Sequence, residues 1–498
     1  MVENSVFADF SKQSSKGVLV IYGKLLLKAF KATWILLIIF IQRFSELSEE
    51  AFSYIYIGIA VFFVFLLIRA YLIYKNFLFK IEDGQFVLKE GILKKKNTSI
   101  SFDRIQNINF KQNLIQQLIN VYEVSVETAG SKDTEIAINA LTYEKAQALK
   151  TALSQVEKKT EALQEELQKP LLKIGFKALL KVSLTENHLR NLLIFVALVF
   201  GLLQQLNDVF TGIGKEEVLG NYADVNPEDI FNSILIFVIL VLILLIIGVL
   251  SSFVRVLLFH FNLTLFIKDK AFDITQGLLT KKSIILSKGK VQSITVSTNP
   301  IKKKLGISFV TFKQAVSGKV KKKQHKLIRI VGCKTEQIKT IKELLYVDES
   351  IDNQARYVPN IYYVLRMYFL ASIGFVALNS IILFLIKDAT WLWGNILAIP
   401  LAILLIQLKY QKAFYQFNKE ILLVGKGRIE THLTYLPFFK IQNINIKQTI
   451  FQKSRNVVNL VLQTASGKIT IPCVEENRAI KLYNYILYKV ESNKESWM

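Results

Sequence analysis

The sequence RIQNIN at residues 104–109 decides the fold, because closely similar sequences return at 290–295 (KVQSIT) and 440–445 (KIQNIN). A glycine precedes the glutamine of each copy by 15 residues, and a third marker follows it by 22 residues. The nine marker positions are Gly91, Gln106 and Thr128 in the first copy, Gly277, Gln292 and Gln314 in the second, and Gly427, Gln442 and Thr464 in the third. Two spacings that agree in three places predict three copies of one structural repeat.

The residues around the markers alternate in polarity. Ile108 and Phe110 fall on one side of an extended chain, and Asn107 and Asn109 fall on the other. A period of two predicts antiparallel β-strands, with the three marker glycines at turns where a positive φ is tolerated. Helical stretches close the copies at 142–167, 336–345 and 475–490. Strands first and one helix last predict a small barrel or bent sheet that is capped by a helix.

The segments before these strands are strongly apolar. The 498-residue chain is 52% hydrophobic, with a mean hydropathy of +0.34. Six apolar runs come in pairs, at 25–41 and 52–74, at 189–206 and 230–258, and at 367–386 and 391–406. A spanning helix needs about 20 apolar residues, so we expect a transmembrane helix hairpin before each strand-rich domain. Lys28 and Lys31 interrupt the first run, so a helix lying flat in the membrane interface is the alternative there.

Charge predicts the orientation of the hairpins. The chain carries 63 Lys and Arg against 39 Asp and Glu, a net charge of +24. The loop at 43–51 holds one base and three acids, and the loop at 207–229 holds one base and six acids. The segments after each pair are rich in lysine and arginine, which the positive-inside rule places in the cytoplasm. We therefore expect a multi-pass protein of the bacterial cytoplasmic (inner) membrane, with the strand-rich domains and both termini in the cytoplasm.

These motifs resemble a known family. The hairpin, the Gly-x-[LI] turn, the [RK]-[IV]-Q-[NS]-I strand and the turn after the third marker are similar to the bacterial pleckstrin-homology (PH) domain family of type two. The threefold arrangement resembles the YdbT-like membrane proteins that carry PH domains. The second copy departs from the pattern at Ser293 and Gln314 and in the basic stretch 317–326. The resemblance implies a seven-stranded bent barrel with a C-terminal helix in each copy, and it implies no defined catalytic activity.

The predicted fold class is therefore a membrane α plus β protein, with three repeats of a transmembrane helix hairpin followed by a PH-like bent β-barrel and a C-terminal helix. The expected boundaries are 20–74 for hairpin 1, 75–168 for PH-like domain 1, 169–258 for an amphipathic elbow and hairpin 2, 259–347 for PH-like domain 2, 355–408 for hairpin 3 and 409–492 for PH-like domain 3.

Catalytic and metal-binding patterns do not emerge from the sequence. The four histidines are His188, His260, His325 and His432, and they lie in different segments without ligand spacing. The two cysteines, Cys333 and Cys473, stand in unrelated contexts and suit small buried side chains better than a metal site. We expect no enzyme activity, no cofactor and no metal.

Lysine clusters are the candidate binding residues. They are Lys94, Lys95, Lys96, Lys281, Lys282, Lys302, Lys303, Lys304, Lys321, Lys322 and Lys323. One interpretation is contact with anionic lipid headgroups, which attract basic residues near a membrane surface by about 1 kcal/mol each. The alternative is a set of solvated loops that only satisfies the topology. Basic amphipathic helices before the spans, around Lys24 and around Lys177, are expected to lie among headgroups.

Three functions agree with the sequence to different degrees. The favoured hypothesis is a non-enzymatic integral membrane scaffold whose PH-like domains bind each other, a protein partner, a second copy or anionic lipid; by analogy with the family it would help the envelope withstand stress. The alternative is a transporter or lipid-handling protein that uses the six helices, although these carry few polar groups. Nucleic acid is not an expected partner, because the lysine clusters lack interleaved aromatic residues.

Overall fold

The computed structural model describes residues 7–42, 48–102, 105–128, 136–153, 170–186, 188, 192, 197, 201, 204, 234–268, 271–315, 328–345, 349–387 and 389–492. They belong to two compact units. The first unit comprises residues 1–128, 133–266 and 273–285, and the second comprises 129–132, 267–272 and 286–498. The division falls inside the second repeat, whose early strands belong mainly to the first unit and whose later strands belong to the second.

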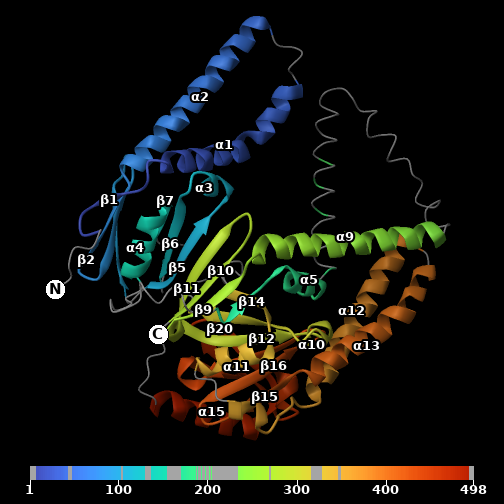
Figure 1. Ribbon diagram of the computed structural model, residues 1–498. Coiled ribbons are helices and arrows are strands. Elements are labelled where there is room, and N and C mark those ends of the chain that lie inside the picture. Colours follow the sequence, from blue (N-terminus) through green and yellow to red (C-terminus); the bar gives the residue numbers. More distant parts are fainter. Residues whose placement is uncertain are drawn as a thin grey trace. The chain divides into compact units, whose positions relative to one another are not determined.

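The described elements recur in the same order in each repeat (Figure 1). The first repeat contains β1 (Ser11–Lys12), α1 (Gly17–Gln42), α2 (Glu49–Lys75), β2 (Leu78–Glu82), β3 (Gln85–Glu90), β4 (Lys96–Ser101), β5 (Ile105–Gln112), α3 (Leu114–Leu118), β6 (Tyr122–Thr128), β7 (Ile136–Leu141) and α4 (Tyr143–Leu153). The second contains β8 (Leu172–Lys173), α5 (Phe176–Leu184), α9 (Ile234–His260), β9 (Thr264–Ile267), β10 (Ala271–Gln276), β11 (Lys281–Ser287), η3 (Lys288–Lys290), β12 (Val291–Thr298), α10 (Pro300–Lys304), β13 (Ser308–Gln314), β14 (Ile328–Cys333) and α11 (Thr335–Glu343). The third contains η4 (Glu349–Asn353), α12 (Tyr362–Ile386), η5 (Ala389–Gly394), α13 (Asn395–Gln411), β15 (Phe414–Phe417), β16 (Ile421–Gly427), β17 (Thr431–Pro437), η6 (Phe438–Lys440), β18 (Ile441–Lys447), α14 (Ile450–Lys453), β19 (Val457–Thr464), β20 (Gly467–Glu475) and α15 (Glu476–Ser492).

The segment before the helices contributes to the first sheet of each repeat. Among the described residues, six strands follow the helices of each repeat, and β1 and β8 add a short strand to β2 and β9. In the third repeat a single bridge between Tyr357 and Tyr415 takes that place. The start of each apolar segment is thereby attached to the first sheet of its own repeat.

The marker positions have one common register. Ile105 faces Thr128, Val291 faces Gln314, and Ile441 faces Thr464. The register shifts immediately after each of these pairs, so the marker glutamine of each repeat is the extra residue of a β-bulge. The 22-residue spacing therefore fixes a bulged hairpin, and the predicted antiparallel strands are confirmed.

The sheets do not follow the boundaries of the repeats. One seven-stranded sheet has the order β7-β6-β5-β11-β10-β9-β8, and one six-stranded sheet has the order β14-β13-β12-β17-β16-β15. Each therefore joins the second half of one repeat to the first half of the next. The separate bent barrel expected for each repeat is corrected accordingly: the described strands of a repeat form two half-sheets, because β5 and β12 are hydrogen-bonded to the following repeat instead of to β4 and β11.

The two halves of a repeat nevertheless share one apolar core. In the first repeat, Phe79 and Phe86 pack together with Val124 and Ile138, and α4 contributes Leu149. In the third repeat, Leu422 and Val424 pack with Leu460 and Ile471, and α15 contributes Ile486. We call the contact between a strand of one repeat and a strand of the next repeat a joint. Ile285 of β11 packs against the core of the first repeat, so the joint between the first and second repeats is apolar as well as hydrogen-bonded. α15 confirms the closing helix predicted at 475–490. α4 confirms the first part of the helix predicted at 142–167, and the rest of that prediction lies outside the described residues.

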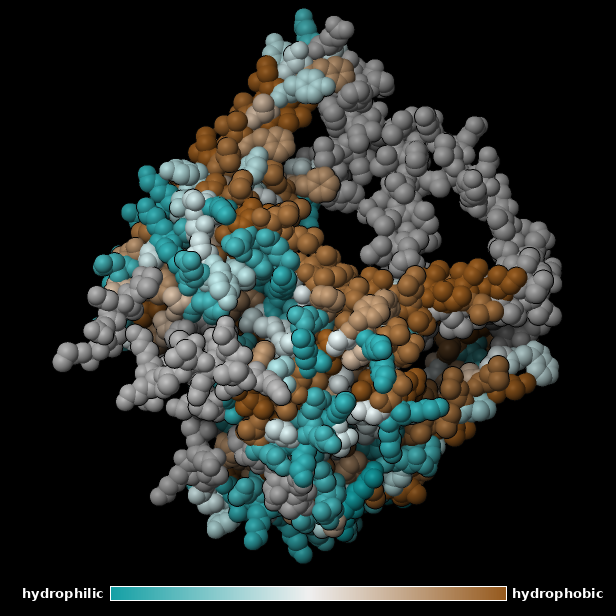
Figure 2. All heavy atoms as spheres, in the orientation of Figure 1, coloured by the Kyte–Doolittle hydropathy of each residue, from teal (hydrophilic) through white to brown (hydrophobic). Residues whose placement is uncertain are grey.

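Four described helices are long and apolar enough to cross a membrane: Glu50–Lys75, Leu242–His260, Tyr362–Leu385 and Leu392–Gln411. Their outward surfaces are apolar, as the brown colouring along the helices in Figure 2 shows. α12 and α13 lie side by side, as predicted for the third hairpin (Figure 1). α1 is helical but is not one of the four, and the predicted run at 189–206 falls almost entirely outside the described residues.

Candidate membrane-contact site

The marker glycines form the first part of the candidate site. Gly91, Gly277 and Gly427 have φ values of 113°, 110° and 139°. A Cβ atom at Gly427 would lie 1.9 Å from the carbonyl oxygen of Glu430, and the corresponding distances at Gly91 and Gly277 are 2.0 and 2.1 Å. Only glycine fits such a turn without displacing the backbone. The prediction of turn glycines with positive φ is confirmed at all three positions.

The second and third of these turns lie at the ends of apolar helices. The amide of Leu278 donates to the carbonyl of Leu258 at 3.0 Å, which holds the second turn against the C-terminal part of α9. The ammonium of Lys412, which directly follows α13, donates to the carbonyl of Ile429 in the third turn. Burial lowers the pKa of Lys412. We call each marker-glycine turn, together with the short helix that follows the bulged strand, a helix-side tip.

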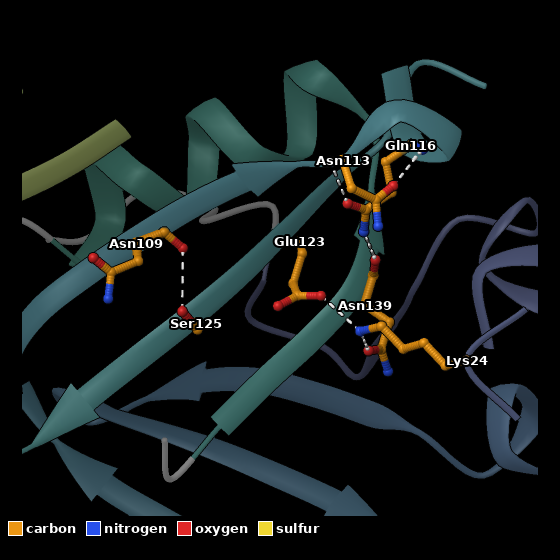
Figure 3. A network of polar contacts seen from close by, with 7 residues as sticks. All are labelled: Lys24, Asn109, Asn113, Gln116, Glu123, Ser125 and Asn139. Carbon is orange, nitrogen blue, oxygen red and sulfur yellow. Dashed lines mark hydrogen bonds and ion pairs between the residues drawn. The ribbon is translucent and has the colours of Figure 1, made fainter. Parts of the chain in front are cut away.

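The short helices of the tips are built by capping residues. The side chain of Asn113 accepts from the amide of Gln116, and Gln116 returns a contact to the amide of Asn113, both at 2.9 Å (Figure 3). Thr449 and Gln452 form the same reciprocal cap in the third repeat, and Asn299 with Pro300 starts the short helix of the second. Such caps satisfy backbone donors that a helix of about one turn leaves unpaired.

Large apolar side chains project from these tips into the surroundings. Leu93 is 100% exposed, Leu118 and Ile450 are 87% exposed, and Phe451 is 75% exposed. Ile301 and Ile429 are exposed at the corresponding places of the second and third repeats. Large apolar side chains that are exposed to this degree indicate contact with another surface. The repeat motif does not include these residues, although an apolar pair directly after a capping residue, as in Thr449-Ile450-Phe451, is a signal for them in the sequence.

Most of the predicted lysines lie at the same tips. Lys94, Lys95 and Lys96 are exposed beside Leu93, Lys281 is exposed and Lys282 is half-buried beside Leu279, and Lys303 and Lys304 are exposed beside Ile301. Lys321, Lys322 and Lys323 fall outside the described residues. The arrangement of exposed apolar side chains with lysines next to them is that of an interfacial anchor.

Lys302 is a correction to the predicted set. It is 1% exposed, its ammonium pairs with the carboxylate of Glu430, and it lies 3.6 Å from the ring centroid of Phe309. A buried ammonium cannot contact a headgroup. Burial raises the pKa of Glu430, but the hydrogen bond from Lys302 and the nearby positive charges outweigh it, so the pKa lies below its usual value. Lys302 thus ties the second repeat to the marker turn of the third.

The first joint between repeats has a similar tie. The side-chain amide of Gln117, in the short helix of the first repeat, donates to the carbonyl of Leu279 at 3.0 Å. Both joints therefore consist of a strand pair, β5 with β11 or β12 with β17, and a side chain from α3 or α10 on the marker turn of the next repeat.

The basic helix around Lys24 is anchored to its own repeat. The ammonium of Lys24 contacts the carboxylate of Glu123 and the side-chain oxygen of Asn139, each at 2.6 Å (Figure 3). Val20 packs with Val121 and Ala140 beneath this contact. α1 therefore begins against β6 and β7, and Lys24 is engaged by protein groups. Lys177 lies on α5, whose buried residues Leu179 and Val182 accompany its packing against α9.

The remaining markers and the thiols are structural. Gln314 and Thr464 are buried opposite the bulges, Gln292 is fully buried and Gln442 is exposed, while the side chains of Gln106 and Thr128 fall outside the description. Burial raises the pKa of the Cys333 thiol to about 12, so this thiol is not reactive at neutral pH. No group of three metal-ligating side chains occurs within the described part of the chain.

The fold and site define a membrane protein with repeated PH-like domains. The family model for the bacterial PH domain matches residues 26–157, 209–346 and 369–490. The chain belongs to this family, and it carries three copies of the domain. It is also 23% identical over 451 residues to the UPF0699 transmembrane protein YdbT of Bacillus subtilis (strain 168), a match that covers 86% of this chain and 89% of the relative.

Proposed function

We propose that this protein is a non-enzymatic scaffold of the bacterial cytoplasmic membrane that holds its PH domains against an anionic bilayer surface. The observation that carries the proposal is the pairing of fully exposed apolar residues with exposed lysines at the helix-side tips, as at Leu93 with Lys94, Lys95 and Lys96. Apolar side chains favour the acyl boundary and lysines favour the headgroups above it. The second and third marker turns adjoin the ends of α9 and α13, where the proposal places the bilayer surface.

The lysines at the tips also support a cytoplasmic location of the PH domains. The positive-inside rule places segments with excess lysine and arginine in the cytoplasm, and the tips lie on that side of the predicted hairpins. Anionic lipids give the cytoplasmic leaflet a negative surface potential, which attracts these lysines. By analogy with the family, we include protection of the envelope under stress in the proposed role.

The polar groups within α12 and α13 favour a structural role over transport. Asn379 and Asn395 donate to each other's side-chain oxygens, at 3.3 and 2.9 Å. Reciprocal amide contacts of this kind hold membrane helices together. Because these two amides satisfy each other, they support hairpin packing better than a solute path.

Depth measurements on the full chain in lipid nanodiscs test the proposal. A nitroxide is attached to Phe451→Cys, Leu93→Cys or, as a control, Lys468→Cys, and collisions with oxygen and with a water-soluble nickel complex are compared. Lys468 lies at the start of β20, opposite Gln463 near the end of β19, about 25 Å along the strand from α14. We expect oxygen to dominate at the two tip positions and nickel to dominate at Lys468.

Lipid composition then separates headgroup attraction from apolar contact alone. Nanodiscs of phosphatidylcholine are compared with nanodiscs that also contain phosphatidylglycerol, at low and high salt. The proposal expects deeper labels with the anionic lipid and a shallower position in high salt, since salt screens surface charges. Equal nickel access at Phe451, Leu93 and Lys468 in all nanodiscs would overturn the membrane contact.

A further inference from the structure

The two joints between repeats use four strands, and the equivalent strand at one edge of the first repeat and at one edge of the third repeat takes part in no joint. The second half-sheet of the first repeat pairs through β5 with β11, and that of the second repeat pairs through β12 with β17. The equivalent strand of the third repeat is β18, which has β19 as its one neighbour among the described strands. The equivalent of β11 and β17 in the first repeat is β4, which has β3 as its one described neighbour.

Burial shows that β18 lacks the cover that its equivalents have. Every residue of β12 from Val291 to Ser297 is buried, whereas Gln442, Asn443, Ile446 and Lys447 of β18 are exposed. Ile446 is 39% exposed, while the equivalent Val296 is 8% exposed. An apolar residue on an uncovered strand edge is a site for strand addition.

β4 likewise lacks the cover that its equivalent β17 has. Ser99 is exposed, whereas the equivalent Tyr435 on β17 is buried beside β12. The hydroxyl of Thr98 is shielded from water and has no hydrogen-bond partner among the described residues. The hydroxyl of the equivalent Thr434 lies 3.1 Å from that of Thr295 across the joint. β4 thus has the side-chain pattern of β17, but no strand equivalent to β12 lies beside it among the described strands.

We propose that β18 of one copy pairs antiparallel with β4 of a second copy, in the register of the β12–β17 joint. That joint sets Ile294 opposite Tyr435, Thr295 opposite Thr434, and Val296 opposite Leu433. Residues at the same distance from the marker glutamine on β12 and β18, or from the marker glycine on β17 and β4, are equivalent. The same register therefore sets Ile444 opposite Ser99, Asn445 opposite Thr98, and Ile446 opposite Asn97 of the second copy. The side-chain amide of Asn445 then supplies a partner for the hydroxyl of Thr98.

The occupant is a second copy because the chain carries both complementary edges and uses the same pairing twice along its own length. The contact joins two different surfaces, so repetition gives a closed ring or an open row of chains. Membrane insertion aligns the copies and confines them to one plane. The inference rests on the proposed scaffold function in that both place the domains at the membrane surface.

The same register predicts how the assembly responds to salt. Lys447 is set opposite Lys96, where the β12–β17 joint has Ser297 opposite His432. Like charges opposite each other weaken a strand pair, and salt screens them. Assembly should therefore increase with ionic strength, whereas the lipid contact of the tips decreases.

Disulfide cross-linking between two singly substituted full-length chains tests the proposal. One chain carries Ile446→Cys and a first tag, and the other carries Asn97→Cys and a second tag; they are co-reconstituted and oxidised. The native thiols Cys333 and Cys473 are buried. Residues directly opposite in a strand pair lie within disulfide range. Because each chain has one introduced cysteine, the expected product is a species of two chains that carries both tags.

The matched control replaces Asn97→Cys by Ser101→Cys, which is four residues, about 13 Å, further along the same strand. We expect at least tenfold less product from this pair. Equal yields from both pairs, no product from either, or a product between Ile446→Cys and a protein of another mass would each overturn the assignment. A doubly substituted chain is expected to give species of three and more chains.

The cross-linking result and the nitroxide result are independent. A bilayer-contacting Phe451 without cross-linked product overturns the assembly alone. Cross-linked product from a chain whose tips stay in water overturns the proposed lipid contact alone.

Discussion

The buried ion pair between the second and third repeats should respond asymmetrically to the loss of either partner. The side chain of Lys302 is 2% exposed, whereas that of Glu430 is 34% exposed. Glu430→Gln removes the carboxylate from an ammonium that water does not reach, and breaking a buried pair in this way costs about 3–5 kcal/mol. Because Glu430 is one-third exposed, we take the lower end, about 3 kcal/mol.

Lys302→Met should cost less. Methionine keeps an apolar stem against Phe309, and the carboxylate left behind can be hydrated, so the loss is about 1 kcal/mol, as for an ordinary hydrogen bond. Since 1.4 kcal/mol corresponds to a factor of about ten, amides of β12 and β17 should exchange roughly 100-fold faster in Glu430→Gln and roughly fivefold faster in Lys302→Met.

Hydrogen exchange of the full chain in detergent, followed by mass spectrometry of peptides from β12 and β17, measures this effect locally. Local opening is preferable to a melting temperature because a chain of several domains does not unfold in one step. Glu420→Gln, at an exposed residue of the same repeat, is the matched control and should leave exchange unchanged. Faster exchange in Lys302→Met than in Glu430→Gln would refute the assignment of the burial cost to the ammonium.

Three further changes test other parts of the structure. Gly427→Ala should destabilise the third repeat by about 2–4 kcal/mol, because the added Cβ meets the carbonyl oxygen of Glu430 at 1.9 Å. Hydrogen exchange of β16 and β17 measures this effect. Gly84→Ala, at a position whose φ is also positive but where nothing lies within 4 Å of the added Cβ, should accelerate exchange of β2 and β3 less. Burial lowers the pKa of His432 although Glu430 opposes it. The neutral imidazole therefore contributes stability that is fully present above the unfolded pKa of about 6.5 and is lost as the pH falls from there through the lower pKa of the folded protein. Exchange of β12 amides, corrected for intrinsic rates, should rise on acidification, and His432→Gln should remove the change. Lys24→Gln should cost less than about 1 kcal/mol, because the pair with Glu123 is partly exposed, and should raise exchange at the start of α1 only.

The sequence predicts the parts of the fold that depend on neighbours in the chain. The marker spacing reports a bulged hairpin, since the register from Ile105 to Thr128 is fixed by the short segment between them. The glycine at each turn is predictable because a steric rule acts within four residues, as between Gly427 and Glu430. Apolar run length likewise predicts the four described helices that are long and apolar enough to cross a membrane.

The sharing of sheets was not predictable from the same patterns. Alternation shows that β12 has two faces, but it does not name the strand that lies at each edge, and both β12 and β18 carry the marker motif. The burial of Lys302 was not predictable for the same reason. Its cluster reads as three surface lysines, and the carboxylate that removes one of them from the surface lies 128 residues away at Glu430. Partners at such separations are set by the joint, which no local spacing encodes.

Strand sharing also separates the surfaces that are open to partners. A strand edge already hydrogen-bonded to another repeat cannot accept a peptide, so β5, β11, β12 and β17 are closed to strand addition. The second repeat uses one edge in each joint and therefore links its neighbours. Within the described sheets, the edges with the pattern of a joint belong to the outer repeats, at β4 and β18. The proposed lipid contact, in contrast, depends on the helix-side tips, and all three repeats carry the marker-glycine turn and the short helix that make up a tip. If the proposed scaffold is correct, three copies of the domain therefore offer three tips to the bilayer, while the proposed assembly uses the β4 and β18 edges that the two joints leave over.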